Sequence, residues 1–332
     1  MDSDKKKRIE TVLAGNVPDR IPVSIWGHDY LREWSAKDLA DQTVEKHRQA
    51  DYDFIKLNPR WTFFGEIWGN KYKPPTEQVF PEVLHRVVAQ ADDFYKVEQA
   101  EPSHPAFKEH LEALELVLEE VGHDVDVICT LFSPLAVAGL LCGVVGDPLT
   151  EMAGQNPGAV HHALEVITES LKLHIRDVLK AGASGLFYAP LPWTSTEICD
   201  PAFYSEFGTP YDLAVLESAK DAPFNMLHAC GNHIQLERFY SYPVHVLNWD
   251  NFGEGNPSLS QVHADSDKVV AGGIPHRTLH EMSHDEIKKD AESSIGDIKD
   301  RIMLTGGCAV FPTLSSDTRQ YIREIAETMR FD

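Results

Sequence analysis

Eight short apolar runs, separated by segments with helical spacing, are the feature that most limits the folds open to this chain. Most runs are apolar almost throughout, which is typical of strands buried on both faces of a parallel sheet. Parallel neighbours need crossover connections, and the helical segments between the runs supply them. The expected strands are residues 21–26, 54–57, 125–131, 185–188, 224–228, 245–249, 268–271 and 302–305.

Helical segments alternate with these strands along the chain, so the sequence predicts an α/β fold, a (β/α)8 TIM barrel. We expect one domain over residues 1–332, because no linker or internal repeat divides the chain. Residues 59–123 are too long for a simple crossover and begin with an aromatic and proline-containing stretch, which predicts an insertion between strands two and three over the barrel mouth. The expected helices are residues 36–50, 106–121, 157–181, 201–220, 284–298 and 317–330, with a short crossover at 258–265.

The net charge limits which partners the protein can bind, and the cysteine content indicates the compartment in which it acts. The net charge is -22, and a field of that sign repels nucleic acid. The uncharged stretch 127–146 contains Pro134 and three glycines and has acidic flanks, so we expect barrel core there and no membrane span. The five cysteines are widely spaced and no apolar leader follows Met1, which together favour a cytoplasmic protein with free or metal-bound thiols.

Potential metal ligands follow two of the expected strands, at the barrel end where such folds carry their chemistry. His228 and Cys230 end the fifth strand, and Cys308 ends the eighth, which lies across the mouth. Side chains two residues apart in an extended chain share a face, so His228 and Cys230 point the same way. Two thiolates and an imidazole suit Zn²⁺, and three protein ligands leave a fourth position open, as in catalytic zinc sites.

Five further residues follow strands and are candidates by the same position rule. Asp250 is a candidate catalytic residue that orients a ligand or acts as a partner of the His228 ring, although an ordinary loop carboxylate fits equally well. His28, Asn58, Tyr188 and Trp249 are candidate substrate-binding residues.

Several segments carry a family resemblance across nearly the whole chain, namely Arg20-Ile21-Pro22-Val23, Phe132-Ser133-Pro134-Leu135, Gly182-Ala183-Ser184-Gly185, His228-Ala229-Cys230-Gly231-Asn232 and Gly306-Gly307-Cys308. With them the chain resembles the uroporphyrinogen decarboxylase superfamily, and within it the zinc-dependent, cobalamin-linked branch that includes methylcobamide:coenzyme M methyltransferases. The specific part is the His-x-Cys-Gly element followed about 80 residues later by a cysteine.

The resemblance implies transfer of a methyl group from a methylated corrinoid, methylcobalamin, to a thiol or similar small acceptor, with a folate also open. His228, Cys230 and Cys308 would hold Zn²⁺. An acceptor thiol of pKa about 8.5 would lose its proton on binding the metal. No cobalamin-binding fingerprint occurs in the chain, so the implied donor is a separate corrinoid protein.

Three alternatives stay open at this point. A tetrapyrrole decarboxylase of the same superfamily needs no metal, but this chain lacks that enzyme's arginine pair after strand one and has Asn58 after strand two and Cys308 after strand eight. A non-catalytic zinc protein would close its site with a fourth ligand, Asp250 or Glu254. The glycine pairs 272–273 and 306–307 could instead cradle a phosphate, although tight turns also need such pairs. The oligomeric state and the role of the insertion, lid or interface, are not readable from the sequence.

Overall fold

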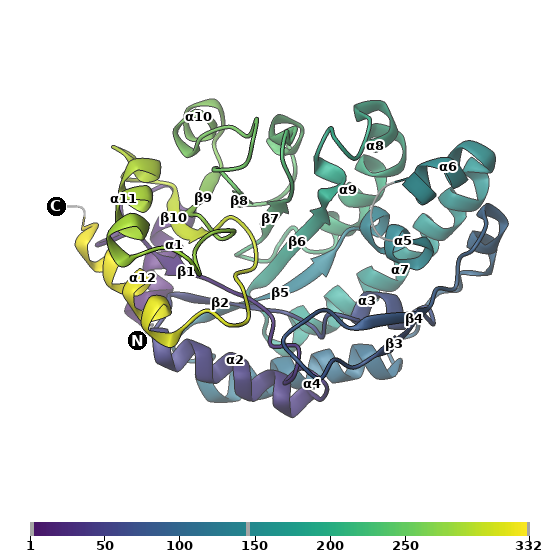
Figure 1. Cartoon of the computed structure of the whole chain (residues 1–332), viewed down its shortest axis with the longest axis horizontal. Helices are drawn as coiled ribbons and strands as arrows, with labels where there is room; N and C mark the ends of the chain where they lie inside the picture. Colours follow the sequence, from purple (N-terminus) through teal and green to yellow (C-terminus); the bar gives the residue numbers. More distant parts are fainter. Residues whose placement is uncertain (1–2, 144–146, 331–332) are drawn as a thin grey trace.

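The computed structural model describes residues 3–143 and 147–330, and its central element is the predicted eight-stranded parallel barrel (Figure 1). Neighbouring strands pair in parallel in the order β1-β10-β9-β8-β7-β6-β5-β2. The strands are β1 Val23–Ser24, β2 Phe54–Leu57, β5 Asp126–Phe132, β6 Gly185–Leu191, β7 Met226–Ala229, β8 Val246–Trp249, β9 Val269–Ile274 and β10 Ile302–Gly306. All eight predicted strands are present, which confirms the (β/α)8 fold.

The ring closes between β1 and β2 through isolated hydrogen bonds. The Asp53 amide donates to the Val23 carbonyl at 2.9 Å, and the Ser24 hydroxyl donates to the Phe54 carbonyl at 2.8 Å. Within the described part of the chain β1 forms a regular ladder with β10 alone, and it is shorter than the predicted run 21–26. The buried Asp53 carboxylate also accepts bonds from Arg8, from Arg20 and from the Val23 amide, so an ion cluster fastens this seam.

Helices surround the barrel, and Figure 1 shows α12, α2 and α4 along one side of it. The longest, α7, begins after Asn156, whose side chain caps the Ala159 amide, and ends at Gly182 with a φ of 116° that favours glycine. The helices are α1 Asp4–Leu13, α2 Ala36–Ala50, α4 Pro105–Val121, α5 Pro134–Cys142, α6 Asp147–Gln155, α7 Pro157–Ala181, α8 Pro201–Phe207, α9 Thr209–Glu217, α10 Leu259–Asp265, α11 His284–Ile295 and α12 Ser316–Thr328.

The single helix expected over residues 201–220 is wrong, because the structure has two helices there, α8 and α9. Pro210 lies in the first turn of α9, and a proline has no amide to continue the preceding helix. Gly208 separates the two helices. Helix α1 was not predicted from the sequence. Its Ile9 and Val12 pack with the side chains inside the barrel, at the end opposite the mouth.

The long connection between β2 and β5 contains several elements. The short helix α3 Phe63–Glu66 is followed by an antiparallel hairpin of β3 Lys71–Lys73 and β4 Glu82–His85, by a 3-10 helix at Ala91–Lys96 and by α4. Its first part borders the barrel mouth, since residues between Pro59 and Phe80 line the main cavity. Helix α4 packs against α2 and α7 in the outer layer.

Two groups of apolar side chains form the core, one inside the barrel and one between strands and helices. The stretch 127–146 forms most of β5 and all of α5, while residues 144–146 lie outside the described residues, as do Met1 and Asp2 at the start of the chain. Among the described helices, none has the length and apolar character needed to cross a membrane.

Candidate metal centre and substrate cavity

His228 lies on β7, and Asn248 on the adjacent strand fixes its ring. The two residues are register partners of β7 and β8, and His228 Nδ1 lies 2.7 Å from Asn248 Oδ1. Asn248 Nδ2 donates to the carbonyls of Ala271 and Gly306, each at 3.0 Å, so its oxygen must face the imidazole. Because the Asn248 oxygen can only accept, His228 Nδ1 must carry the proton. In the neutral ring Nε2 is then unprotonated and can bind a metal ion.

Both cysteines of the predicted site approach this imidazole. One ligand atom each of His228, Cys230 and Cys308 lie within 4.8 Å of one another, the arrangement expected of a metal-binding group. Thr194, at the end of a 3-10 helix Pro192–Thr194, exchanges two bonds with the Cys230 backbone: its hydroxyl contacts the carbonyl at 2.8 Å and the amide at 3.1 Å. Gly307 precedes Cys308, and a Cβ there would lie 2.5 Å from Asp250 Cα, so the close approach of these strand ends needs glycine.

The two thiols share a hydrogen bond that separates their pKa values. Cys230 donates to Cys308, which holds the pKa of Cys308 well below the ordinary thiol value, and the His228 ring acts in the same direction. The same bond and burial raise the pKa of Cys230. These contacts favour the thiolate form of Cys308, and thiolate is the form that binds a metal.

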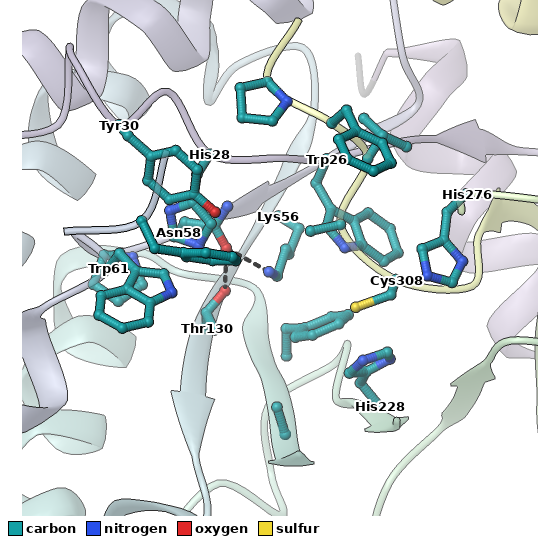
Figure 2. Close-up of a pocket in the computed structure, with 18 of the residues that line it drawn as sticks. Trp26, His28, Tyr30, Lys56, Asn58, Trp61, Thr130, His228, His276 and Cys308 are labelled. Atoms are coloured by element: carbon teal, nitrogen blue, oxygen red, sulfur yellow. Dashed lines mark hydrogen bonds between the residues drawn. The ribbon is translucent and has the colours of Figure 1, made fainter. Parts of the chain in front are cut away.

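A cavity of about 660 Å³ opens from this centre across the barrel mouth. Figure 2 shows His228, Cys308 and His276 on one side and Tyr30, Trp61 and Asn58 on the other, with Lys56 between them. The cavity wall is aromatic in large part, and this part consists of Trp26, Tyr30, Trp61, Phe64, Phe80, Phe132, Phe187 and Phe311.

Two of the predicted substrate-binding residues, His28 and Asn58, do line this cavity. The His28 ring bonds to Glu33 at 2.8 Å and stacks on Tyr30 with 5.4 Å between ring centres. Asn58 Oδ1 accepts bonds from Lys56 and from the Thr130 hydroxyl (Figure 2).

The structure places the other two predicted substrate-binding residues outside the cavity. Tyr188 is completely buried and donates to Asp212 Oδ1 at 2.5 Å, in the layer between strands and helices. Trp249 packs in the same layer and donates to the Pro257 carbonyl at 2.9 Å. Alternation along the strands is the physical reason, since Phe187 and Ala189 of β6 face the cavity and the residue between them faces outward.

Asp250 is not the partner of His228, because Asn248 occupies that role. Its carboxylate accepts a bond from Arg277 Nε at 2.8 Å and lies 3.9 Å from His276 Nδ1. Neither Asp250 nor Glu254 belongs to the metal-binding group found among the described residues, so that group has three ligands and not the four of a closed structural site.

The phosphate cradle is not supported by the backbone of the glycine pairs. The Gly273 amide donates to Asn251 Oδ1 at 2.9 Å, and the Gly307 amide faces the Ile274 carbonyl at 3.4 Å. Both donors therefore already have acceptors within the protein.

Sequence reasoning missed Asn248, Lys56, His276 and Arg277. The signal for Asn248 and Lys56 was available, since each is a polar residue at an inward position of an otherwise apolar strand. His276 and Arg277 follow β9 at the barrel mouth, so the position rule that selected Cys308 could also have selected them.

Known proteins resemble this chain along most of its length. It is 19% identical over 303 residues to the methylcobamide:CoM methyltransferase MtbA of Methanosarcina mazei, covering 89% of this chain and 86% of that protein. The MtbA of Methanosarcina acetivorans is 20% identical over 198 residues, which cover 59% of this chain and 57% of that protein.

Solved structures share the fold. A methyltransferase from Methanosarcina mazei has a TM-score of 0.83 at 19% identity, with 99% of both chains covered. A B12-independent methionine synthase from a Shewanella species has a TM-score of 0.61 at 13% identity, covering 88% of this chain and 86% of that one. The family model for uroporphyrinogen decarboxylase (URO-D) matches residues 4–329, and the chain therefore belongs to the uroporphyrinogen decarboxylase family.

Proposed function

We propose that the protein is a zinc-dependent methyltransferase that moves a methyl group from a methylated corrinoid to a small acceptor bound in the barrel mouth. The observation that carries the proposal is the convergence of His228, Cys230 and Cys308 within 4.8 Å at the mouth of the cavity. The relatives named methylcobamide:CoM methyltransferase support the same class of reaction. The cysteines are free, which suits the reducing cytoplasm that we propose as the place of action.

The donor set fits Zn²⁺ on three counts. Nε2 of His228 is bare because Nδ1 is bonded to Asn248, one thiol has a depressed pKa, and the three atoms come from strand ends that strand pairing holds in place. When bound, zinc would lower the pKa of an acceptor thiol so that it is a thiolate at neutral pH.

The protein's own residues would orient the reactants. Asn248 holds the imidazole in one tautomer and one orientation, and Thr194 holds the Cys230 backbone. The stacked Phe187 ring, 5.2 Å from His228 between centres, shields one face of the imidazole from water. Positioning of this kind reduces the entropy lost when an acceptor and a methyl donor meet in line.

The methyl donor comes from outside this chain in our proposal. A methylated corrinoid supplies an electrophilic methyl group, with the electrons of the cobalt–carbon bond remaining on cobalt. A separate corrinoid protein would present this group at the open mouth of the cavity, and a small thiol or a folate would receive it.

Demethylation of free methylcobalamin, followed by its absorbance, tests the proposal with a panel of thiols and a folate. Wild type should demethylate methylcobalamin with at least one acceptor, and Cys308→Ser should lose most of this activity. Cys142→Ser is a matched control, because Cys142 is a half-buried thiol of α5 away from the cavity lining. Conversion of uroporphyrinogen by both wild type and Cys308→Ser, with no demethylation, would instead establish the decarboxylase alternative.

A further inference from the structure

Lys56 points into the cavity from β2, and no carboxylate of the described residues pairs with it. Its ammonium group bonds to the Asn58 side-chain oxygen and lies 4.3 Å from the centre of the Phe187 ring and 5.7 Å from that of Trp26. Burial lowers the pKa of Lys56 to about 7, against the ordinary lysine value. The Cys308 sulfur favours the charged form of Lys56, but a cation held inside a cavity wall without a carboxylate is still costly, and natural proteins seldom keep one without a use.

The two arginines of the cavity wall are paired with carboxylates. Arg60 contacts Glu66 at 2.6 Å and Arg277 contacts Asp250 at 2.8 Å. Among the described residues that line the cavity there is no aspartate or glutamate, although the chain has 52 of them. Among the described lysines and arginines of the wall, Lys56 alone lacks a carboxylate, and it faces a space that no carboxylate of the described lining enters.

Most of the remaining wall suits a flat apolar body. Eight aromatic side chains border the cavity, and Ala309, Val310 and Pro312 after Cys308 add further apolar surface. A volume of about 660 Å³ is within the range of sites that take organic molecules of considerable size. Lys56 lies between the Asn58 and Thr130 pair and the end of the cavity that contains Cys308 (Figure 2). One ligand could therefore contact both the Lys56 ammonium group and the metal-binding residues.

We infer that the small substrate of this site is an organic anion with a planar apolar body, whose negative group pairs with the Lys56 ammonium. The aromatic wall would hold the body, and the far end of the molecule would face His228 and Cys308. This inference rests on the proposed function for the role of that far end, but the anion pairing itself is a binding property of the cavity.

Binding of a matched pair of probes, 2-naphthoate and the neutral 2-naphthamide, tests the pairing at pH 6.5. Titration would be followed by tryptophan fluorescence, because Trp26 and Trp61 border the cavity, and by calorimetry. Wild type should bind the carboxylate at least about tenfold more tightly than the amide, since a buried charge-assisted hydrogen bond contributes more than a neutral one. Lys56→Met should reduce this ratio to near one.

Two further variants make the result decisive. Lys37→Met removes an exposed lysine of α2 and should leave the ratio unchanged. Lys56→Gln serves if Lys56→Met does not fold, and it should also abolish the preference. Absence of naphthoate binding to wild type, or a preference that persists in a folded Lys56 variant, would overturn the inference.

The inference and the proposed function fail separately. A charge preference that depends on Lys56, in a protein that never demethylates methylcobalamin, would leave the anion site standing and refute the methyltransferase. Demethylation that proceeds equally well with 4-mercaptobenzoate and 4-mercaptobenzamide would keep the methyltransferase and refute the anion site.

Discussion

Replacing Asn248 with alanine removes the side chain that sets which nitrogen of His228 is free. In the structure Asn248 Oδ1 accepts from His228 Nδ1, and its amide nitrogen is held by two backbone carbonyls and the Thr305 hydroxyl, each at 3.0 Å. Without this partner the imidazole samples both tautomers and other ring orientations, and only some of them present Nε2 to a metal ion. Loss of such a hydrogen bond costs about 10-fold to 100-fold in metal affinity, or about 1.4 to 2.7 kcal/mol.

The assay is zinc affinity at pH 7.5, measured by competition with a chromophoric chelator. The matched control is Asn225→Ala, because Asn225 is also completely buried and bonds to backbone atoms of Leu186 and Ala219, but at the opposite end of β7. Both variants leave buried backbone groups without partners, so both should lose stability by about 1 to 3 kcal/mol. Only Asn248→Ala should lose zinc affinity, and equal affinities in the two variants would refute the reasoning.

Three further predictions concern stability. Asp53→Ala removes the buried carboxylate shared by Arg8 and Arg20, which then keep only their less buried partners Asp19 and Glu327. It should lower the free energy of unfolding by about 1 to 3 kcal/mol in urea titrations, and no measurable loss would show that the seam cluster does not stabilise the barrel. Burial raises the pKa of Asp212 from 3.8 to about 6, so its contribution is full below about pH 4 and is lost as pH rises through 6. Wild type should therefore lose on the order of 3 kcal/mol relative to Asp212→Asn between pH 4 and 7, and a constant difference would contradict this. Tyr188→Phe removes one hydrogen bond to Asp212 and should lower the free energy of unfolding by roughly 1 to 3 kcal/mol, while zinc affinity, measured as above, stays at the wild-type value. A drop in zinc affinity would show that Tyr188 acts on the metal-binding residues after all.

The barrel itself was predictable because burial on both faces leaves a strong local signal. Runs such as 302–305 are apolar at every position except a terminal threonine, and helical segments ending in signals such as Gly182 separate them. The single helix predicted over residues 201–220 was wrong, although the sequence contains a local signal for a break there, Gly208 followed by Pro210. The prediction relied on helical spacing and did not use this signal.

The candidate site was predictable only where a motif fixed both position and facing. His228 and Cys230 share a face by their spacing, whereas Tyr188 and Trp249 were selected by position at a strand end alone. Moving one residue along a strand reverses the facing of the side chain, and the sequence near these strand ends does not set which residues face inward.

Contacts between residues far apart in the sequence could not be predicted from local sequence patterns. Asp250 pairs with Arg277 from the next strand end, and Asn248 takes the place beside His228 through the register of β7 and β8. Lys56 meets Asn58 and Phe187 only once three strands are in place. Such contacts depend on register and side-chain packing over the whole barrel, which no single segment specifies.

Metal content is the most direct test of the central claim that His228, Cys230 and Cys308 form a zinc centre. The protein would be purified without added metal and measured by mass spectrometry of the element, with wild type beside Cys308→Ser and the Cys142→Ser control. The account predicts about one zinc per chain in wild type and in the control, and a large loss in Cys308→Ser. Absence of zinc from all three, with Cys230 and Cys308 freely alkylated, would contradict it.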